Sequence, residues 1–260
     1  IAVHGQTVYH APPVSWQLFN PTVLAAAAGV PVVCDLRAAD LARGGQGAPI
    51  TPLADWVLFR HDHERRAVVN LGGFCNITLL PASPSGDHDS LQHISGMDVC
   101  ACNHLLDGIA RRLMHKPYDE TGAAALSGTV HDDALEDLSG VLSSQTRAHR
   151  SLGTGDELGE WISRFRAHVS AEDLAATACE GLGQTIARRL SDGAAPPDRI
   201  LLAGGGVHNA ALVKAIGGWC SAKVDRVDDN GVPASYREAA EMAVLGALCE
   251  DRVPITLPNV

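Results

Sequence analysis

The stretch AVVNLGGFCNITLL, residues 67–80, decides the fold. Two apolar runs rich in β-branched residues, 67–71 and 75–80, flank the pair Gly72-Gly73, and this arrangement predicts a β-hairpin that turns on the two glycines. The backbone N–H groups of such a turn can also bind phosphate oxygens. From these residues alone, a purely structural hairpin and a phosphate-binding turn are equally good interpretations.

A second unit of the same kind lies farther along the chain. The run Ile200-Leu201-Leu202-Ala203 predicts a strand, Gly204-Gly205-Gly206 follows it, and a helix is expected from about Asn209. Bare backbone at a helix N-terminus lets an anion approach closely, because no Cβ intervenes and the helix dipole favours negative charge. The motif is neither GxGxxG nor the Walker pattern. Three consecutive glycines still favour a nucleotide site over a plain turn.

The remaining elements extend this pattern in both directions. We predict a buried strand over residues 30–34, a helix capped by Asn103, irregular structure over 128–155, a long helix opened by Ser170, and a last helix from about Tyr236 to Glu250. Strands that alternate with helices indicate an α/β fold. The change of pattern near residue 67 predicts two domains, residues 1–66 and 67–260.

Composition excludes several classes of protein. The chain has 260 residues, 46% of them apolar, and carries 20 basic against 30 acidic side chains, a formal net charge of −10. This balance argues against a nucleic-acid partner. No window is long and apolar enough for a membrane span. The seven cysteines are scattered and odd in number, which favours reduced thiols and a cytoplasmic location. The first residues resemble a strand entered partway, so we expect the chain to begin inside a fold.

Further candidate ligand groups are charged residues. Asp35, Arg37 and Asp40 precede the glycine-rich loop RGGQGAP, residues 43–49, and Asp98 follows a short strand-like run. On the last helix, Glu238 fits a capping box with Ser235, whereas Glu241 has no such explanation and is open to either a solvated or a ligand-binding role. The sequence CACNH, residues 100–104, is too crowded for a structural zinc site, so we expect no metal held by cysteine and histidine.

Eight ordered blocks together resemble the anhydro-N-acetylmuramic acid kinases. They are HGQT (4–7), CDLRAADLARGGQGAP (34–49), VVNLGGFCNIT (68–78), GMDVCACN (96–103), KPYDETG (116–122), GTGDELGEW (153–161), AGGGVHN (203–209) and REAAEMAVLG (237–246). The resemblance implies an actin/hexokinase-like (ribonuclease H-like) two-lobed α/β fold. It also implies an enzyme that uses ATP and Mg²⁺ to open the 1,6-anhydro bridge of the amino sugar and to phosphorylate O6, in peptidoglycan recycling.

The resemblance also implies roles for single residues. Asp98 matches the family's general base. Asp35, Arg37 and Gln46 fall in blocks that line the sugar cleft, and the acidic position of the last helix is matched by Glu241, with Glu238 as the weaker alternative. Gly72 and Gly73 match a phosphate-side hairpin, and Gly204, Gly205 and Gly206 match the adenosine-side turn. The implied partners are the amino sugar and ATP, and a homodimer is left open.

The chain departs from the family pattern at two places. No GTSxDGxD-like phosphate loop precedes HGQT, so the first lobe is expected to be partial. A TGPGN-like segment is replaced by Val99-Cys100-Ala101-Cys102-Asn103, and we expect the new side chains to stand where a ligand would need bare backbone. The alternative hypothesis is therefore a catalytically impaired descendant that binds a sugar, a nucleotide or a partner protein.

Overall fold

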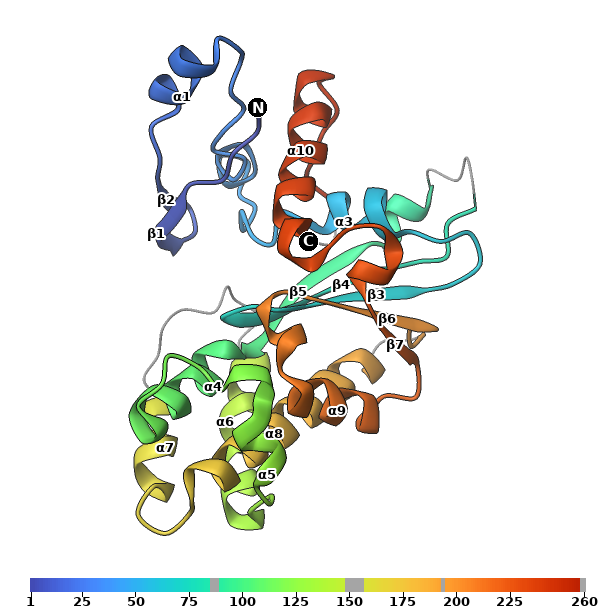
Figure 1. The fold of residues 1–260 in the computed structure, drawn as a ribbon. Helices are drawn as coiled ribbons and strands as arrows, with labels where there is room; N and C mark the ends of the chain where they lie inside the picture. The colour runs from blue at the N-terminus through green and yellow to red at the C-terminus, as the bar shows by residue number, and fades with distance from the viewer. Residues whose placement is uncertain (85–88, 148–156, 193–194, 258–260) are drawn as a thin grey trace.

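A five-stranded sheet forms the centre of the molecule (Figure 1). The computed structural model describes residues 1–84, 89–147, 157–192 and 195–257. The strand order is β5-β4-β3-β6-β7, with β3 antiparallel to β4, β4 antiparallel to β5, and β3, β6 and β7 parallel to one another. Their bounds are β3 Arg66–Leu71, β4 Phe74–Leu80, β5 Ser95–Ala101, β6 Arg199–Ala203 and β7 Lys223–Arg226.

The predicted hairpin is confirmed. β3 and β4 pair in register from Arg66 opposite Leu80 to Leu71 opposite Cys75, and Gly72 and Gly73 form the turn. Successive residues of β3 enter different layers: Val69 packs in the larger hydrophobic cluster below the sheet and Val68 in the smaller cluster above it. A strand buried on both faces has no polar alternation, which explains its continuous apolar pattern.

Most helices cover one face of the sheet, the lower one in Figure 1. They are α4 Asn103–Ile109 with the π-helical turn Ala110–Met114, α5 Ala123–Ser127, α6 Asp132–Arg147, α7 Glu157–Phe165, α8 Ala171–Ser191 and α9 Ala210–Trp219. The upper face is covered by α3 Pro52–Phe59 and α10 Arg237–Glu250. Short 3₁₀ turns complete the described elements: Asp89–His93, Glu120–Gly122, Gly205–His208, Val227–Asn230 and Ala234–Tyr236.

The predicted long helix opened by Ser170 is confirmed as α8, which packs against α4, α5, α6 and α9. Its N-cap Ser170 accepts a hydrogen bond from the backbone N–H of Asp173 at 3.0 Å. Apolar residues at intervals of four form one buried stripe along the helix: Leu174, Ala178, Leu182, Ile186 and Leu190. Such a stripe contributes most of the stability of a helix, because tertiary burial outweighs intrinsic propensity.

The prediction of irregular structure over 128–155 is wrong for most of that segment. Helix α6 occupies residues 132–147 and packs against α8 through Ala134, Leu138 and Leu142, which are fully buried. Three apolar residues at intervals of four are easily hidden among the acidic and hydroxyl residues of the exposed face. The last part of the segment, and residues 153–156 of the GTGDELGEW block, lie outside the described residues.

The N-terminal region, residues 1–51, is built differently. It contains the hairpin β1 Gln6–Ala11 and β2 Val14–Leu18, the helix α1 Pro21–Ala28, which has no buried residue, and the short helix α2 Ala38–Leu41. The predicted buried strand at 30–34 is wrong. A single parallel bridge joins Val33 to Ala2, and Val30 is exposed, because no other described strand lies alongside to complete a ladder.

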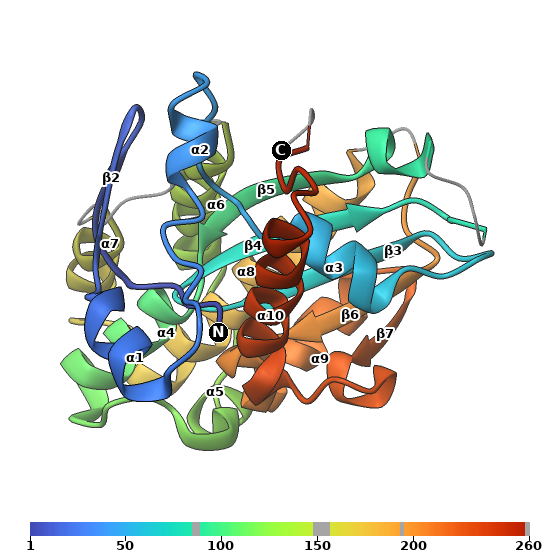
Figure 2. The same ribbon diagram turned by 90° about the horizontal axis from the view of Figure 1, so that it is seen from above.

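The N-terminal region meets the rest of the chain at α10 (Figure 2). Leu36 packs with Ala54, Met242 and Leu245. Ala2 lies over Gly246, where an added Cβ would come within 2.3 Å of the Ala2 Cβ. Since α3 packs on β3, β4 and α10, it is part of the sheet layer. The predicted boundary at 66/67 stays a prediction, and this packing favours a division before Pro52.

Two predicted helix caps are corrected. The N-cap of α4 is Cys102, and the Asn103 amide instead donates to the carbonyl of Leu71 at 3.0 Å. The N-cap of α10 is Tyr236, which makes no side-chain cap, and the predicted capping box of Ser235 and Glu238 is absent. Among the described residues no helix is long and apolar enough to cross a bilayer.

Candidate active site

The two glycine turns lie against each other at the carboxyl ends of the parallel strands β3 and β6. A Cβ at Gly204, which has φ +80°, would lie 2.6 Å from the Asn70 Oδ1, and one at Gly206 would lie 2.6 Å from the Leu71 Cβ. Asn103 closes the junction through its bond to the Leu71 carbonyl. Carboxyl ends of parallel strands are the usual ligand edge of such sheets.

The surface of the second turn is open to a ligand. Gly205 is exposed, and the atom nearest to an added Cβ would be the Asn103 amide nitrogen at 3.7 Å. Asn209 caps α9 by accepting from the Leu212 N–H at 3.0 Å. A phosphate or ribose could therefore approach bare backbone beside a capped helix N-terminus.

The KPYDETG block is packed against the same helix start. Gly122, at φ +74°, leaves no room for a side chain, since an added Cβ would lie 2.2 Å from the Asn209 Oδ1. Asp119 accepts from the backbone N–H groups of Ala124 and Ala125 at 3.0 and 2.9 Å and so holds the start of α5. Blocks separated by almost ninety residues in sequence thus lie side by side next to the second glycine turn.

Asp98 lies on β5, opposite Asn76 of β4 and beside a register shift between Cys75 and Asn76. Its carboxylate is half-buried and interacts electrostatically with Arg37 and His10 of the N-terminal region. The structure therefore brings Asp98 and Arg37 together, although 60 residues separate them in sequence. This pair lies where the sheet meets the N-terminal region, the place at which the family resemblance implies a sugar cleft, and we call this junction the cleft.

The residues that replace the TGPGN-like segment do not project into this cleft. Val99, Cys100, Ala101 and Cys102 are buried in the core, and β5 remains paired with β4 as far as Ala101. The expectation that their side chains would block a ligand is therefore wrong. Burial raises the pKa of the Cys100 thiol to about 12, and burial together with the neighbouring Cys100 raises that of Cys102, so both stay protonated at neutral pH.

Arg37 is hydrogen-bonded to two neighbours, Gly47 and His4. Its Nη1 donates to the Gly47 carbonyl at 2.5 Å, and its Nη2 donates to the His4 Nε2 at 3.1 Å. Gln17 also donates to the His4 Nε2, at 2.7 Å. Because two donors share that nitrogen, it must be unprotonated. Burial and the Arg37 charge lower the pKa of His4, which keeps the ring neutral.

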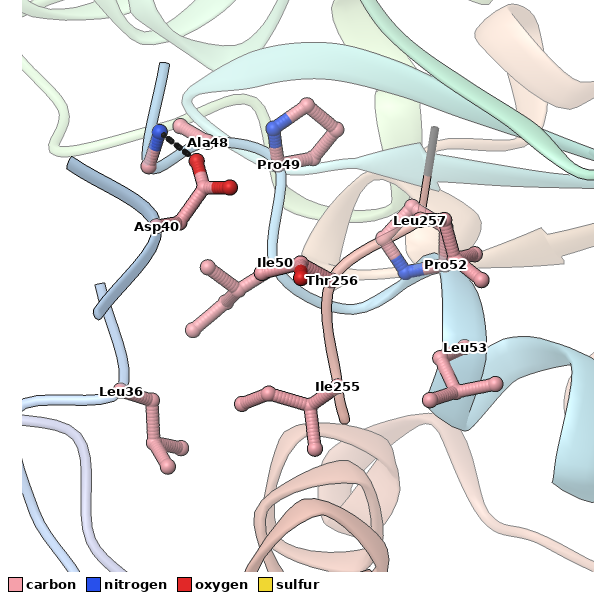
Figure 3. Close-up of a pocket in the computed structure, with 11 residues that line it drawn as sticks. Leu36, Asp40, Ala48, Pro49, Ile50, Pro52, Leu53, Ile255, Thr256 and Leu257 are labelled. Atoms are coloured by element: carbon pink, nitrogen blue, oxygen red, sulfur yellow. Dashed lines mark hydrogen bonds between the residues drawn. The ribbon is translucent and has the colours of Figure 1, made fainter. Parts of the chain in front are cut away.

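The loop RGGQGAP is hydrogen-bonded to Asp40, whose carboxylate is drawn near Ala48 and Pro49 in Figure 3. The Asp40 Oδ2 accepts from the Gly47 N–H at 2.7 Å, and an added Cβ at Gly45 would collide with that carboxylate. This loop brings the exposed Gln46 to the cleft, and the Gln46 backbone lies beside the ring of His10. The glycines at 45 and 47 therefore serve the loop's own geometry. Arg37 and Gln46 are thereby held at the cleft edge.

Asp35 lies in the N-terminal region, beside the β1–β2 hairpin. It has φ +54° and is exposed, and it lines a pocket of about 280 Å³ together with Gln17, Trp16 and Phe19. Gln17 links this pocket to His4 and through it to Arg37. Asp35 thus adjoins the cleft through Gln17.

The two glutamates of α10 have opposite environments. Glu241 is 1% exposed, and its carboxylate lies 2.7 Å from the Arg237 Nη2, inside a cluster that includes Asp55. Glu238 is exposed and interacts electrostatically with His4 at the cleft. A sugar-binding role for Glu241 stays a prediction, and the geometry favours Glu238 for the cleft position.

His4, His10 and Asn103 are residues that sequence reasoning did not assign to the site. His4 belongs to the HGQT block, so the block itself was a signal, but its hydrogen bond to Arg37 spans 33 residues. Asn103 was expected only as a helix cap, and His10 lies in none of the quoted blocks. Their placement depends on the β1–β2 hairpin and on the junction of the glycine turns, which become evident only in three dimensions.

Comparison with known proteins identifies the family. A family model described as anhydro-N-acetylmuramic acid kinase matches residues 1–260. The chain is similar to the curated enzyme of that name from Bordetella pertussis, with 37% identity across the whole chain and 68% of the relative. It is also similar to that from Salinibacter ruber, with 34% identity across the whole chain and 69% of the relative.

The fold has a counterpart among solved structures. The activator of the 2-hydroxyisocaproyl-CoA dehydratase from Clostridium difficile, solved with bound ADPNP, superposes with a TM-score of 0.52 over 89% of this chain and 81% of that one, at 15% identity. That level of identity supports the fold alone. The family match and the shared fold lead to one conclusion: this chain belongs to the anhydro-N-acetylmuramic acid kinase family and is a kinase with an actin/hexokinase-like α/β fold.

Proposed function

We propose that this kinase opens the 1,6-anhydro bridge of anhydro-N-acetylmuramic acid with water and transfers the γ-phosphoryl group of ATP to O6. The product would be N-acetylmuramic acid 6-phosphate. The observation that supports this most is the continuity of the site: the open turn at Gly205 adjoins the end of β3, the hairpin turn is hydrogen-bonded to the residues that follow β5, and Asp98 on β5 interacts electrostatically with Arg37. A nucleotide and a sugar can thus lie end to end.

Asp98 would act as the general base. It takes a proton from water as the oxygen of that water bonds to the anomeric carbon, and the bond between that carbon and O6 breaks. The released O6 then bonds to the γ-phosphorus as the bond to the β-phosphate oxygen breaks, which yields ADP. A positioned base contributes about 10²–10⁴-fold to such a step. Arg37 and the Asp98 carboxylate attract each other electrostatically.

Arg37, Gln46 and Glu238 would orient the sugar, with Asp35 at the adjoining pocket, and the backbone of Gly72, Gly73 and Gly204–Gly206 would position the nucleotide. Arg37 is suited to an acidic sugar, because a guanidinium pairs with a carboxylate in a planar, two-point contact. In phosphoryl transfer the protein supplies mainly such positioning and charge stabilisation.

Mg²⁺ would supply charge neutralisation on the β- and γ-phosphates. Within the described residues no group of three or more His, Cys, Asp or Glu side chains could hold a metal ion. This donor set fits Mg²⁺ that arrives with the nucleotide, since Mg²⁺ keeps several waters and binds phosphates with few protein carboxylates. The half-buried Asn76, opposite Asp98, would offer a side-chain oxygen near the hairpin turn.

The decisive experiment compares Asp98→Asn with the parent protein. ADP release that depends on the anhydro sugar should fall by about 10²–10⁴-fold, because the amide keeps the shape but cannot accept a proton. Sugar binding by calorimetry should persist. Asp107→Asn on α4 is the matched control, since its carboxylate pairs with Arg111 away from the cleft. An Asp98→Asn protein that keeps the parental rate and melting temperature would rule out this role.

A further inference from the structure

A buried ionic cluster links the upper helices to the sheet directly behind the cleft. We propose that Asp55, Arg237 and Glu241 form a positioning device that fixes the first turn of α10 against the sheet, so that Glu238 faces the cleft at a set place relative to Asp98. The inference rests on the proposed function of the cleft. It assigns these three residues no contact with the sugar.

The cluster is closed to solvent and has a defined geometry. Arg237 donates from Nε and Nη2 to the Asp55 Oδ1 at 3.2 and 2.6 Å, and from Nη2 to Oδ2 at 2.8 Å. The exposed fractions of Asp55, Arg237 and Glu241 are 0%, 3% and 1%. Such two-point pairs fix orientation as well as distance, because the guanidinium and the carboxylate are both planar.

The same carboxylate reaches the sheet. The Thr78 Oγ1 donates to the Asp55 Oδ2 at 2.6 Å. Thr78 lies on β4 opposite Gly96 of β5, two residues before Asp98. A continuous set of contacts therefore runs from Asp98 along β5, across to Thr78, through Asp55 to Arg237, and to Glu238, the next residue of α10.

The start of α10 depends on this contact for its orientation. No side chain caps the helix, so the usual means of fixing a helix N-terminus is absent. Replacing a buried ion pair with well-packed apolar residues often leaves stability unchanged or higher. A gain in stability therefore does not explain why charged residues lie here. The orientation that they impose on the first turn of α10 does explain it.

The protonation state of Glu241 fits this role. Burial and the neighbouring Asp55 charge raise the pKa of Glu241 to about 9, despite the Arg237 cation. At neutral pH the cluster then holds one anion, Asp55, one cation, Arg237, and a neutral acid able to donate to Asp55. Glu238 is the other charged group near Glu241. A neutral cluster of this kind tolerates burial.

The test separates positioning from stability by kinetics. Arg237→Met and Asp55→Asn should each raise the KM for the anhydro sugar or lower kcat by about tenfold or more, while the KM for ATP stays within about twofold, because the nucleotide turns are remote from the cluster. Removing both charges in Asp55→Asn/Arg237→Met should restore the melting temperature without restoring sugar turnover.

Two further variants make the result interpretable. Glu64→Gln breaks a half-buried ion pair, with Arg199 at 2.8 Å, at the ends of β3 and β6 opposite to the glycine turns. It should lower the melting temperature and leave the sugar KM unchanged. Glu241→Gln keeps a neutral group of nearly the same shape, so the sugar KM should stay near the parental value.

The inference would be overturned if Arg237→Met and Asp55→Asn behaved like Glu64→Gln, losing melting temperature alone. It would also be overturned if Glu241→Gln folded normally but lost sugar binding, since Glu241 would then contact the sugar itself. Failure of the proposed function looks different: Asp98→Asn would keep parental turnover whatever the α10 variants do. The two ideas are therefore tested by separate variants.

Discussion

The N-terminal region, residues 1–51, and the remainder of the chain, which we call the body, bury their apolar side chains to very different extents. Every strand of the central sheet except the edge strand β7 carries fully buried residues, and helices cover both faces. In the N-terminal region Trp16, Leu18 and Val23 are 63%, 66% and 66% exposed, and no described residue covers them. Stability is thus concentrated in the body, while the N-terminal region contributes Arg37, Gln46 and His4 to the cleft.

The two regions also hold their charges differently. The body encloses Asp55 and Arg237 completely and pairs Arg199 with both Glu64 and Asp225. In the N-terminal region, Arg37 depends on the Gly47 carbonyl, on His4, and on its charge attraction to Asp98 across the cleft. The positions of the charged side chains are therefore fixed firmly in the body and weakly in the N-terminal region.

Hydrogen exchange should show the largest contrast. Amides of β3 and β6 should open only with global unfolding, about 5–15 kcal/mol, whereas those of β1 and β2 should open at close to zero cost. The reason is that the central strands are paired on both sides and buried, while β1 and β2 pair only with each other. Mass spectrometry of exchanged peptides measures this. Equal protection of Thr7–His10 and Val68–Leu71 would contradict the comparison.

Truncating one apolar residue in each region should sharpen the contrast. Leu202→Ala on β6 should lower the free energy of unfolding by about 2–5 kcal/mol, since that side chain is fully buried between layers. Val14→Ala on β2, which is 55% exposed, should change it by less than about 0.5 kcal/mol. Chemical denaturation followed by tryptophan fluorescence measures both. Comparable losses would show that the N-terminal region shares the core.

A third prediction concerns pH and Glu241. Its pKa in the folded protein, about 9, lies above the ordinary value of 4.5, so folding favours the protonated acid. The contribution of Glu241 to the free energy of unfolding is complete below pH 4.5 and decreases as the pH rises toward 9. Glu241→Gln should remove that dependence and raise the melting temperature at pH 8 by about 2–4 °C per kcal/mol gained. An unchanged pH profile in a scanning calorimeter would disprove the protonated state.

The smallest effect should come from His4. Its pKa is lowered, so the folded arrangement favours the neutral ring and is lost as the pH falls below 6.5. Sugar affinity should therefore weaken a few-fold between pH 7 and pH 5, about the net value of one hydrogen bond. His4→Gln offers an acceptor that does not titrate and should flatten this profile. Calorimetry at both pH values measures it, and an equally steep profile in His4→Gln would exclude the histidine.

Local sequence patterns were sufficient where the element forms its own contacts. The hairpin at Gly72-Gly73, the glycine turn before α9 and the Ser170 cap were all predictable, because turn chemistry and helical periodicity act over a few residues. Patterns failed where the partner was distant. The run at 30–34 looks like a strand, yet a strand forms only when a neighbour accepts its hydrogen bonds.

The sequence blocks that resemble the family predicted residues of the candidate site, but they did not predict the contacts between these residues. Asp98, Arg37 and Gln46 were singled out by the family resemblance, and the structure places them around one cleft. The choice between Glu238 and Glu241 could not be made from sequence. It depended on which face of α10 meets Asp55, and a capping box that is not formed had offered Glu238 another explanation.

The contact between Ala2 and Gly246 gives α10 a second role, because it fixes how closely the N-terminal region approaches the body. Because Gly246 has no side chain, the backbone of the N-terminal region rests almost directly on the helix, and the thickness of that contact helps to set the separation of the two regions. Side chains of graded size at position 246 would act as spacers. They would yield a set of proteins with stepwise wider clefts, whose dimensions small-angle scattering could calibrate and against which ligand-induced closure could be measured.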